Sequence, residues 1–132
     1  MLNSIELLMI ETKPADIRLT QEYLKEYKIA NCLNVVKDGE EALRFLYRQN
    51  EYTLVSLPDL ILINLSMILK KGAHLPKQIK NDPTLSHIPI VVLTAFEGEE
   101  DSLSDRSFID LCLPKPVNPD SLFSLMKRGD DF

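Results

Sequence analysis

Five short, mainly apolar runs, separated by stretches of mixed polarity, constrain the fold of this sequence more than any other feature. They occupy residues 5–10, 32–36, 60–63, 88–93 and 108–113. Short apolar runs bounded by turn-forming residues are typical of strands buried on both faces. The stretches between them show the three- and four-residue apolar spacing of helices. The sequence therefore predicts alternating strands and helices, with the strands in a parallel sheet.

Proline and capping residues indicate where the helices begin. Pro14 suits the first position of a helix that follows the first strand. Asp38 followed by Glu41 is typical of a capping box at the start of the next helix. Pro76 fits the first turn of a short helix before the fourth strand, so that helix is predicted to begin late.

The last third of the chain carries weaker helix signals. Residues 97–107 are acidic, rich in serine and poor in apolar side chains, and are predicted to be weakly helical. Asn118 caps a last helix that has Pro119 at its first position. Five strands, five helices and right-handed crossovers predict a flavodoxin-like (βα)5 α/β sandwich with a five-stranded parallel sheet, order 2-1-3-4-5.

Composition narrows the class of protein. The chain has 132 residues, of which 45% are hydrophobic and 27% charged, so residues 1–132 are predicted to form one domain without a separate output domain. The formal net charge of -5 argues against nucleic acid as a partner. The apolar runs are too short to span a membrane, and residues 1–10 lack the features of a signal peptide. A cytoplasmic location is expected.

The chain contains two cysteines, Cys32 and Cys112, and two histidines, His74 and His87. Each cysteine lies in an apolar stretch, which predicts buried free thiols in a reducing compartment rather than a disulfide. The histidines lack the spacing of metal ligands and are expected in loops or on the surface. No metal site is predicted from these four residues.

Polar residues follow four of the predicted strands. In an open parallel sheet the carboxyl ends of the strands form the crevice where ligands bind. Residues at these ends are the Glu11-Thr12 pair, Asn64, Thr94 and Lys115. Asn64 is the least expected of them, because an amide is neither a nucleophile nor a strong metal ligand.

At this point the sequence resembles the receiver domains of two-component response regulators, the CheY-like family. The segments that carry the resemblance are LLMIETKPADIRLTQEYL, VVKDGEEALRFL, PDLILINL, IKNDPTLSHIPIVVLTA and LPKPVNP. The chain looks most similar to single-domain receivers that pair with phytochrome-type sensor kinases, which share the long loop before the third strand.

The resemblance implies a phosphorylation site, which this chain matches only in part. In the family, two acids hold Mg²⁺, an aspartate takes a phosphoryl group from a kinase histidine, a hydroxyl bonds that group, and a Lys-Pro step completes the pocket. The matching residues are Glu11, Thr94, Lys115 and Pro116. The departures are Thr12 in place of the second acid, Asn64 in place of the phosphoacceptor, and Cys112 in place of the aromatic switch residue.

These departures have chemical consequences. The Asn64 side chain carries no full negative charge and has a delocalised nitrogen lone pair, so it is a poor nucleophile. Mg²⁺ needs carboxylate oxygens, and the count at the crevice is one acid, Glu11, against one base, Lys115. This balanced pair is expected to be stable without a cation. The chain is interpreted as a pseudo-receiver, not an enzyme, without a cofactor and with weak or absent Mg²⁺ binding.

Three alternatives stay open. Asn64 could be an engineered Asp-to-Asn change in an ordinary phosphoacceptor receiver, although Thr12 would then be unexplained. A hydroxyl could be phosphorylated instead, and the candidates are Thr12, Ser66 and Thr94. A small enzyme or ligand binder is disfavoured, because no glycine-rich phosphate loop follows the first strand and the chain has only 4 glycines.

The resemblance also implies protein partners. A sensor histidine kinase or another response regulator is expected, and a homodimer could form through the fourth helix, fifth strand and fifth helix. The fourth helix would fall in the stretch EGEEDSLSDRS, residues 97–107, whose weak apolar pattern favours a mobile acidic segment.

Overall fold

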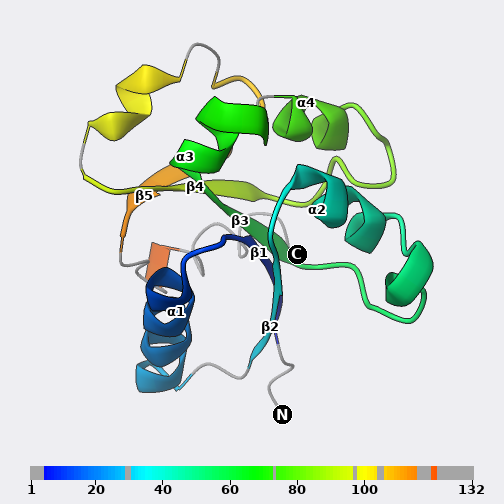
Figure 1. Cartoon of the computed structure of the whole chain (residues 1–132), viewed down its shortest axis with the longest axis horizontal. Helices are drawn as coiled ribbons and strands as arrows, with labels where there is room; N and C mark the ends of the chain where they lie inside the picture. Colours follow the sequence, from blue (N-terminus) through cyan, green and yellow to red (C-terminus); the bar gives the residue numbers. More distant parts are fainter. Residues whose placement is uncertain are drawn as a thin grey trace.

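The computed structural model describes residues 5–28, 31–72, 74–96, 98–103, 106–115 and 120–121. Its five strands are all parallel and form one sheet in the order β2-β1-β3-β4-β5, which confirms the predicted topology (Figure 1). The strands are β1 (Ile5–Ile10), β2 (Asn31–Val36), β3 (Leu60–Asn64), β4 (Ile90–Thr94) and β5 (Leu111–Pro114).

Helices cover both faces of the sheet. Helix α1 (Pro14–Glu26) lies on one face, whereas α2 (Gly39–Leu46), α3 (Leu65–Met67) and α4 (Leu75–Lys80) lie on the other (Figure 1). A π-helical turn, η2 (Ile68–Gly72), continues α3. Helical structure after β3 therefore begins at once, whereas the sequence predicted a later start. The helix with Pro76 in its first turn is present as predicted.

Two apolar clusters, one on each face, hold these layers together. Leu8 of β1 packs in the cluster that includes α2, α3 and α4. Its neighbours Leu7 and Met9 pack in the other cluster, with Leu24 of α1. All residues of β3 and β4 are buried, as expected for central parallel strands covered on both faces.

The predicted capping residues of α1 and α2 are found at the starts of these helices. The Asp38 carboxylate accepts a hydrogen bond from the Glu41 backbone N–H at 2.8 Å. The Glu41 carboxylate reaches back to the N–H of Lys37 at 2.9 Å, one residue before the cap. Pro14 stands in the first turn of α1. Asn118 and Pro119 lie outside the described residues.

Two strands begin later than predicted. Strand β4 begins at Ile90 rather than residue 88, because the Ile88 N–H bonds to Leu85 in a turn while the Ile88 side chain packs in the core. Strand β5 begins at Leu111 rather than residue 108, because Ile109 lies in a turn closed on Arg106. In both places, burial without strand pairing explains the apolar residues.

The connection between β4 and β5 lacks the predicted helix in its described part. Only a 3-10 turn, η3 (Glu99–Ser102), forms there. A stretch with so few apolar side chains cannot bury a helical face, and helices of this size depend on such packing. The expected fourth helix of residues 97–107 is therefore a correction; residues 97, 104 and 105 are not described.

The loop before β3 lies at the surface, as predicted, but aromatic contacts anchor it. It contains a 3-10 turn, η1 (Asn50–Tyr52). The Tyr52 ring lies 5.1 Å from the Phe45 ring, and its hydroxyl donates to the Glu41 carboxylate. This bond raises the pKa of Tyr52 to about 12 and lowers the pKa of Glu41.

The exposure of the cysteine and histidine side chains agrees only in part with the predictions. Both cysteines are free, but Cys32 is exposed on the edge strand β2, so its predicted burial is wrong. Cys112 on β5 is half-buried, and burial raises the pKa of its thiol. His74 and His87 are exposed. Within the described ranges, every helix is too short or too polar to cross a membrane.

Candidate functional site

The carboxyl ends of the four strands β1, β3, β4 and β5 meet at one edge of the sheet. Three polar side chains there are almost fully buried: Glu11 is 2% exposed, Asn64 6% and Thr94 1%. Lys115 follows β5 and is half-buried. Because these strands are neighbours in the sheet, the four residues lie at the same edge, and this group of strand-end residues is called the cleft.

Glu11 is the centre of the hydrogen-bond network in this cleft. Its Oε2 accepts from the backbone N–H groups of Thr12 and Lys13, at 2.9 and 3.1 Å, just before α1 begins. Its Oε1 accepts from Asn64 Nδ2 at 2.8 Å and from Lys115 Nζ at 3.4 Å. Both carboxylate oxygens are therefore satisfied by the protein itself, as a buried charge requires.

Asn64 uses both ends of its side-chain amide. Its Oδ1 caps α3 by accepting from the Ser66 N–H at 3.1 Å and from the Ser66 hydroxyl at 3.2 Å. A backbone N–H can only donate, so the amide oxygen faces Ser66 and the amide nitrogen faces Glu11. An aspartate in this position would place a second carboxylate against Glu11, and close carboxylates repel each other without a cation.

Lys115 contacts a second acid that the sequence reasoning missed. Its Nζ lies 2.7 Å from Asp16 Oδ2 and 3.4 Å from Glu11 Oε1. The predicted balance of one acid and one base is therefore wrong, because two carboxylates share one ammonium group. Asp16 lies in the first turn of α1, five residues after Glu11, and this position on the expected helix was the available signal.

The remaining predicted site residues differ in their contacts and exposure. The Thr94 carbonyl accepts from the Lys115 N–H at 2.8 Å, which joins the ends of β4 and β5. The Thr12 side chain is exposed, and only its backbone N–H bonds to Glu11. Cys112 packs against the apolar cluster on the α2 side of the sheet. Pro116 lies outside the described residues.

The donor set does not fit the Mg²⁺ ion of the receiver family. Mg²⁺ takes oxygen ligands in octahedral geometry. Asn64 presents an amide nitrogen to Glu11, and the Glu11 oxygens already accept four hydrogen bonds. In the part of the chain that the structure describes, three or more His, Cys, Asp or Glu side chains nowhere gather as a metal site.

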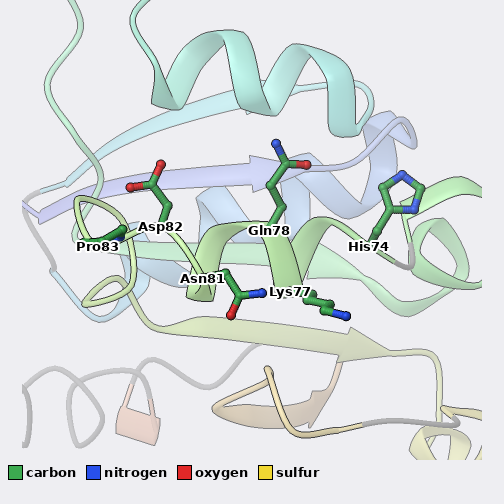
Figure 2. A pocket seen from close by; sticks show the side chains of 6 residues that line it. All are labelled: His74, Lys77, Gln78, Asn81, Asp82 and Pro83. Atoms are coloured by element: carbon green, nitrogen blue, oxygen red, sulfur yellow. The ribbon is translucent and has the colours of Figure 1, made fainter.

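A separate surface hollow lies along α4 and the turn after it. Its volume is about 580 Å³. The residues that line it are His74, Lys77, Gln78, Asn81, Asp82 and Pro83 (Figure 2). The Asp82 carboxylate accepts a 2.6 Å hydrogen bond from the hydroxyl of Tyr47, the residue that follows α2. This hollow shares no residue with the cleft and contains none of the predicted site residues.

Comparisons with known proteins agree with this architecture. The sequence profile of the "Response regulator receiver domain" matches residues 7–127. Response regulator Rcp1 of Synechocystis sp. is 35% identical over 127 residues, covering 96% of this chain and 86% of Rcp1. The crystal structure of the phosphorylated cyanobacterial phytochrome response regulator RcpA is 34% identical, has a TM-score of 0.74, and covers 98% of this chain and 94% of RcpA.

One solved relative carries a metal ion. The crystal structure of the Mn²⁺-bound form of Rcp1 is 35% identical to this chain, with a TM-score of 0.72, and the match covers 97% of this chain and 93% of that one. The fold and these matches lead to one conclusion. The chain belongs to the response regulator receiver domain family, close to the single-domain regulators of phytochromes, and its function is two-component signalling.

Proposed function

We propose that this chain is a pseudo-receiver: a cytoplasmic two-component signalling module that acts through protein–protein contacts, without catalysis and without phosphorylation of an aspartate. The single observation that carries the proposal is the double engagement of the Asn64 amide, which donates to Glu11 and accepts from Ser66. The amide thereby closes the position that a phosphoacceptor would use.

Two chemical requirements of aspartyl phosphorylation are missing. The nucleophile must be an ionised oxygen, and the Asn64 side chain has none. The developing charge on the phosphoryl group needs a divalent cation, and the second acid of the family site is replaced by Thr12, whose side chain is exposed. The ammonium group of Lys115 instead partly neutralises Glu11 and Asp16.

The partner in this proposal is a protein. A sensor histidine kinase or another response regulator fits the family, and β5 with its flanking segments is the surface through which partners or a second copy would bind. The Mn²⁺ ion of Rcp1 is not carried over to this chain, because the donor atoms differ at Asn64.

Intact-mass spectrometry tests the proposal. The wild-type chain, incubated with acetyl phosphate and Mg²⁺, is expected to show no phosphoryl adduct. The matched control is the double variant Thr12→Asp/Asn64→Asp, which restores both missing acids and is expected to gain one acid-labile adduct.

Two outcomes would contradict the proposal. A wild-type adduct that disappears in Asn64→Ala would show that this position accepts the phosphoryl group. An acid-stable phosphate on Thr12, Ser66 or Thr94 of protein purified from its native cells would favour regulation through a hydroxyl group instead.

A further inference from the structure

The hollow along α4 lies at the end of the longest stretch of the chain without an acidic residue. Residues 60–81 contain four lysines and none of the 20 acidic residues, although the formal net charge of the chain is -5. The segment that carries α4 is therefore opposite in charge to the molecule as a whole. Such a local field attracts and orients a negatively charged partner.

Most side chains of the hollow are available to a ligand. Within the described residues, four exposed side chains of its lining form no hydrogen bond or ion pair: His74, Lys77, Gln78 and Asn81. Lys80 differs from them, because its ammonium group pairs with Asp110 at 2.8 Å. The hollow thus offers the Lys77 ammonium group and two side-chain amides as donors for the oxygen atoms of a ligand.

Asp82 is the acid among the lining residues, and its carboxylate is already engaged. Its Oδ2 accepts from the Tyr47 hydroxyl at 2.6 Å. Its Oδ1 accepts from the Thr84 N–H at 2.8 Å and from the Thr84 hydroxyl at 2.7 Å. Figure 2 shows Asp82 at one end of the row of side chains and His74 at the other. An acidic ligand would therefore approach through the part of the row between His74 and Gln78.

Helix α4 presents these side chains from an anchored backbone. Leu75 and Ile79 on its inner side are buried in the core. The row from His74 to Asn81 is about 10 Å long at a rise of 1.5 Å per residue, which is about the length of three residues of an extended peptide. A small anion would contact only part of this row, whereas a peptide could contact its whole length.

We propose that the hollow along α4 binds an acidic peptide segment of a partner protein, with a carboxylate at Lys77 and the peptide backbone against the amides of Gln78 and Asn81. The proposal rests on the proposed function, because it takes the chain to act through contacts with other proteins, and it adds a second surface to the one around β5. Nucleic acid is a weaker match, since one lysine and one histidine are too few for a phosphate backbone.

Amide NMR of the full chain tests this proposal with a hexaglutamate peptide as the probe. Saturable shifts are expected for backbone amides within residues 74–82, and no shifts with hexaglutamine. Lys77→Glu is expected to weaken the binding of hexaglutamate roughly tenfold. The matched control is Lys25→Glu, which makes the same charge change at an exposed lysine of α1, on the other face of the sheet (Figure 1), and is expected to bind like wild type.

Four results would overturn the proposal. Hexaglutamate that shifts no amide within residues 74–82 would show that the hollow does not bind acidic chains. Equal weakening in Lys77→Glu and Lys25→Glu would show an effect of net charge alone. Equal shifts with inorganic phosphate would show binding of an adventitious ion only. Shifts of the same amides that grow with protein concentration, without peptide, would assign the hollow to a second copy of the chain.

Failure of this proposal is separable from failure of the proposed function. The peptide experiment involves neither a phosphodonor nor Mg²⁺, and Lys77 lies outside the cleft. A phosphoryl adduct on Asn64 would contradict the pseudo-receiver and leave the peptide shifts unchanged.

Discussion

The two connections that flank the cleft on either side of β4 are built in opposite ways. The connection from β3 to β4 contains helices and buries apolar side chains along its length: Leu65, Ile68, Leu75, Ile79, Leu85 and Ile88. In the described part of the connection from β4 to β5, the only helical element is η3, and its apolar residues Leu103 and Ile109 are only partly buried.

The difference teaches which side of the cleft is fixed by packing and which by individual polar contacts. Apolar burial is additive over many atoms and hard to remove by one change. A segment held by a few hydrogen bonds opens at a lower free energy than the global fold. Asn64 therefore stands on the rigid side, and the proposed partner surface around β5 lies on the adjustable side.

The strongest test compares one apolar side chain from each connection. Ile79→Ala is expected to lower the free energy of unfolding by about 3 kcal/mol, because it leaves a cavity in the core. Leu103→Ala is expected to cost only about 1 kcal/mol, since this side chain is partly exposed. Urea unfolding measures both values, and equal losses would break the contrast between the two connections.

Asn64→Asp tests the polar side of the rigid connection. The new carboxylate would face Glu11 Oε1 where the amide now donates at 2.8 Å. We expect a loss of about 2 kcal/mol at neutral pH, partly recovered by Mg²⁺, which two carboxylates can bind. Wild-type stability should be the same with Mg²⁺ and with EDTA. The exposed variant Asn50→Asp is the control, and a similar loss there would indicate a general charge effect.

Asp110 links the two connections, and its replacement sharpens the comparison. Its Oδ2 lies 2.8 Å from Lys80 Nζ of α4 and accepts from the Ile90 N–H at 2.7 Å. Asp110→Ala is expected to lower the free energy of unfolding by about 1.5 kcal/mol. Asp101→Ala, which breaks an exposed ion pair with Arg106, is expected to cost less than about 0.5 kcal/mol. Urea unfolding of both variants decides whether the link is significant.

The loop before β3 is a third case, because the contacts of one aromatic residue, Tyr52, hold it in place instead of many buried apolar side chains. Tyr52→Phe removes the hydroxyl bond to Glu41 and is expected to cost about 1 kcal/mol. Because the bond raises the pKa of Tyr52 from 10.0 to about 12, its contribution is complete below pH 10 and is lost as the pH rises through about 12.

Glu41, which accepts the bond from Tyr52, determines the acidic end of the same pH profile. The pKa of Glu41 is lowered from 4.5, so its share of the stability is present above pH 4.5 and disappears as the pH falls below that value. The stability difference between wild type and Tyr52→Phe should therefore form a plateau at neutral pH. A stability difference that stays constant at both low and high pH would contradict a stabilising hydrogen bond between Tyr52 and Glu41.

The smallest effect concerns the two thiols. Burial raises the pKa of Cys112 on β5, whereas Cys32 is exposed on β2. Iodoacetamide at pH 8 is expected to label Cys32 at least roughly tenfold faster, as followed by peptide mass spectrometry. Equal rates would show that the Cys112 thiol is as accessible to the reagent as the Cys32 thiol.

Most of the fold could be predicted from the sequence, because burial on both faces leaves a clear apolar signature in β1, β3 and β4. The beginnings of β4 and β5 could not, since Ile88 and Ile109 are apolar for packing reasons and lie in turns. The predicted helix in residues 97–107 failed for the converse reason: charged side chains that favour a helix locally cannot supply a face to bury.

The residues of the candidate site could be predicted from their positions at the strand ends. Only some of the hydrogen bonds and ion pairs among them could be predicted. Parallel topology alone places Glu11, Asn64, Thr94 and Lys115 at one edge of the sheet. Asp16 was missed because an acid in the first turn of a helix is already explained by the helix dipole. Its contact with Lys115 depends on how α1 packs against the sheet, which no local pattern reveals.

The orientation of one amide group has a consequence for how this protein would respond to its surroundings. With the hydrogen atoms of Asn64 directed at Glu11, the charge of that acid is already met from within the molecule. In the proposed pseudo-receiver, changes in magnesium concentration or in the supply of high-energy phosphate would then have no site of action at this acid. Such a protein would report on which neighbours are present rather than on the metabolic state of the cell.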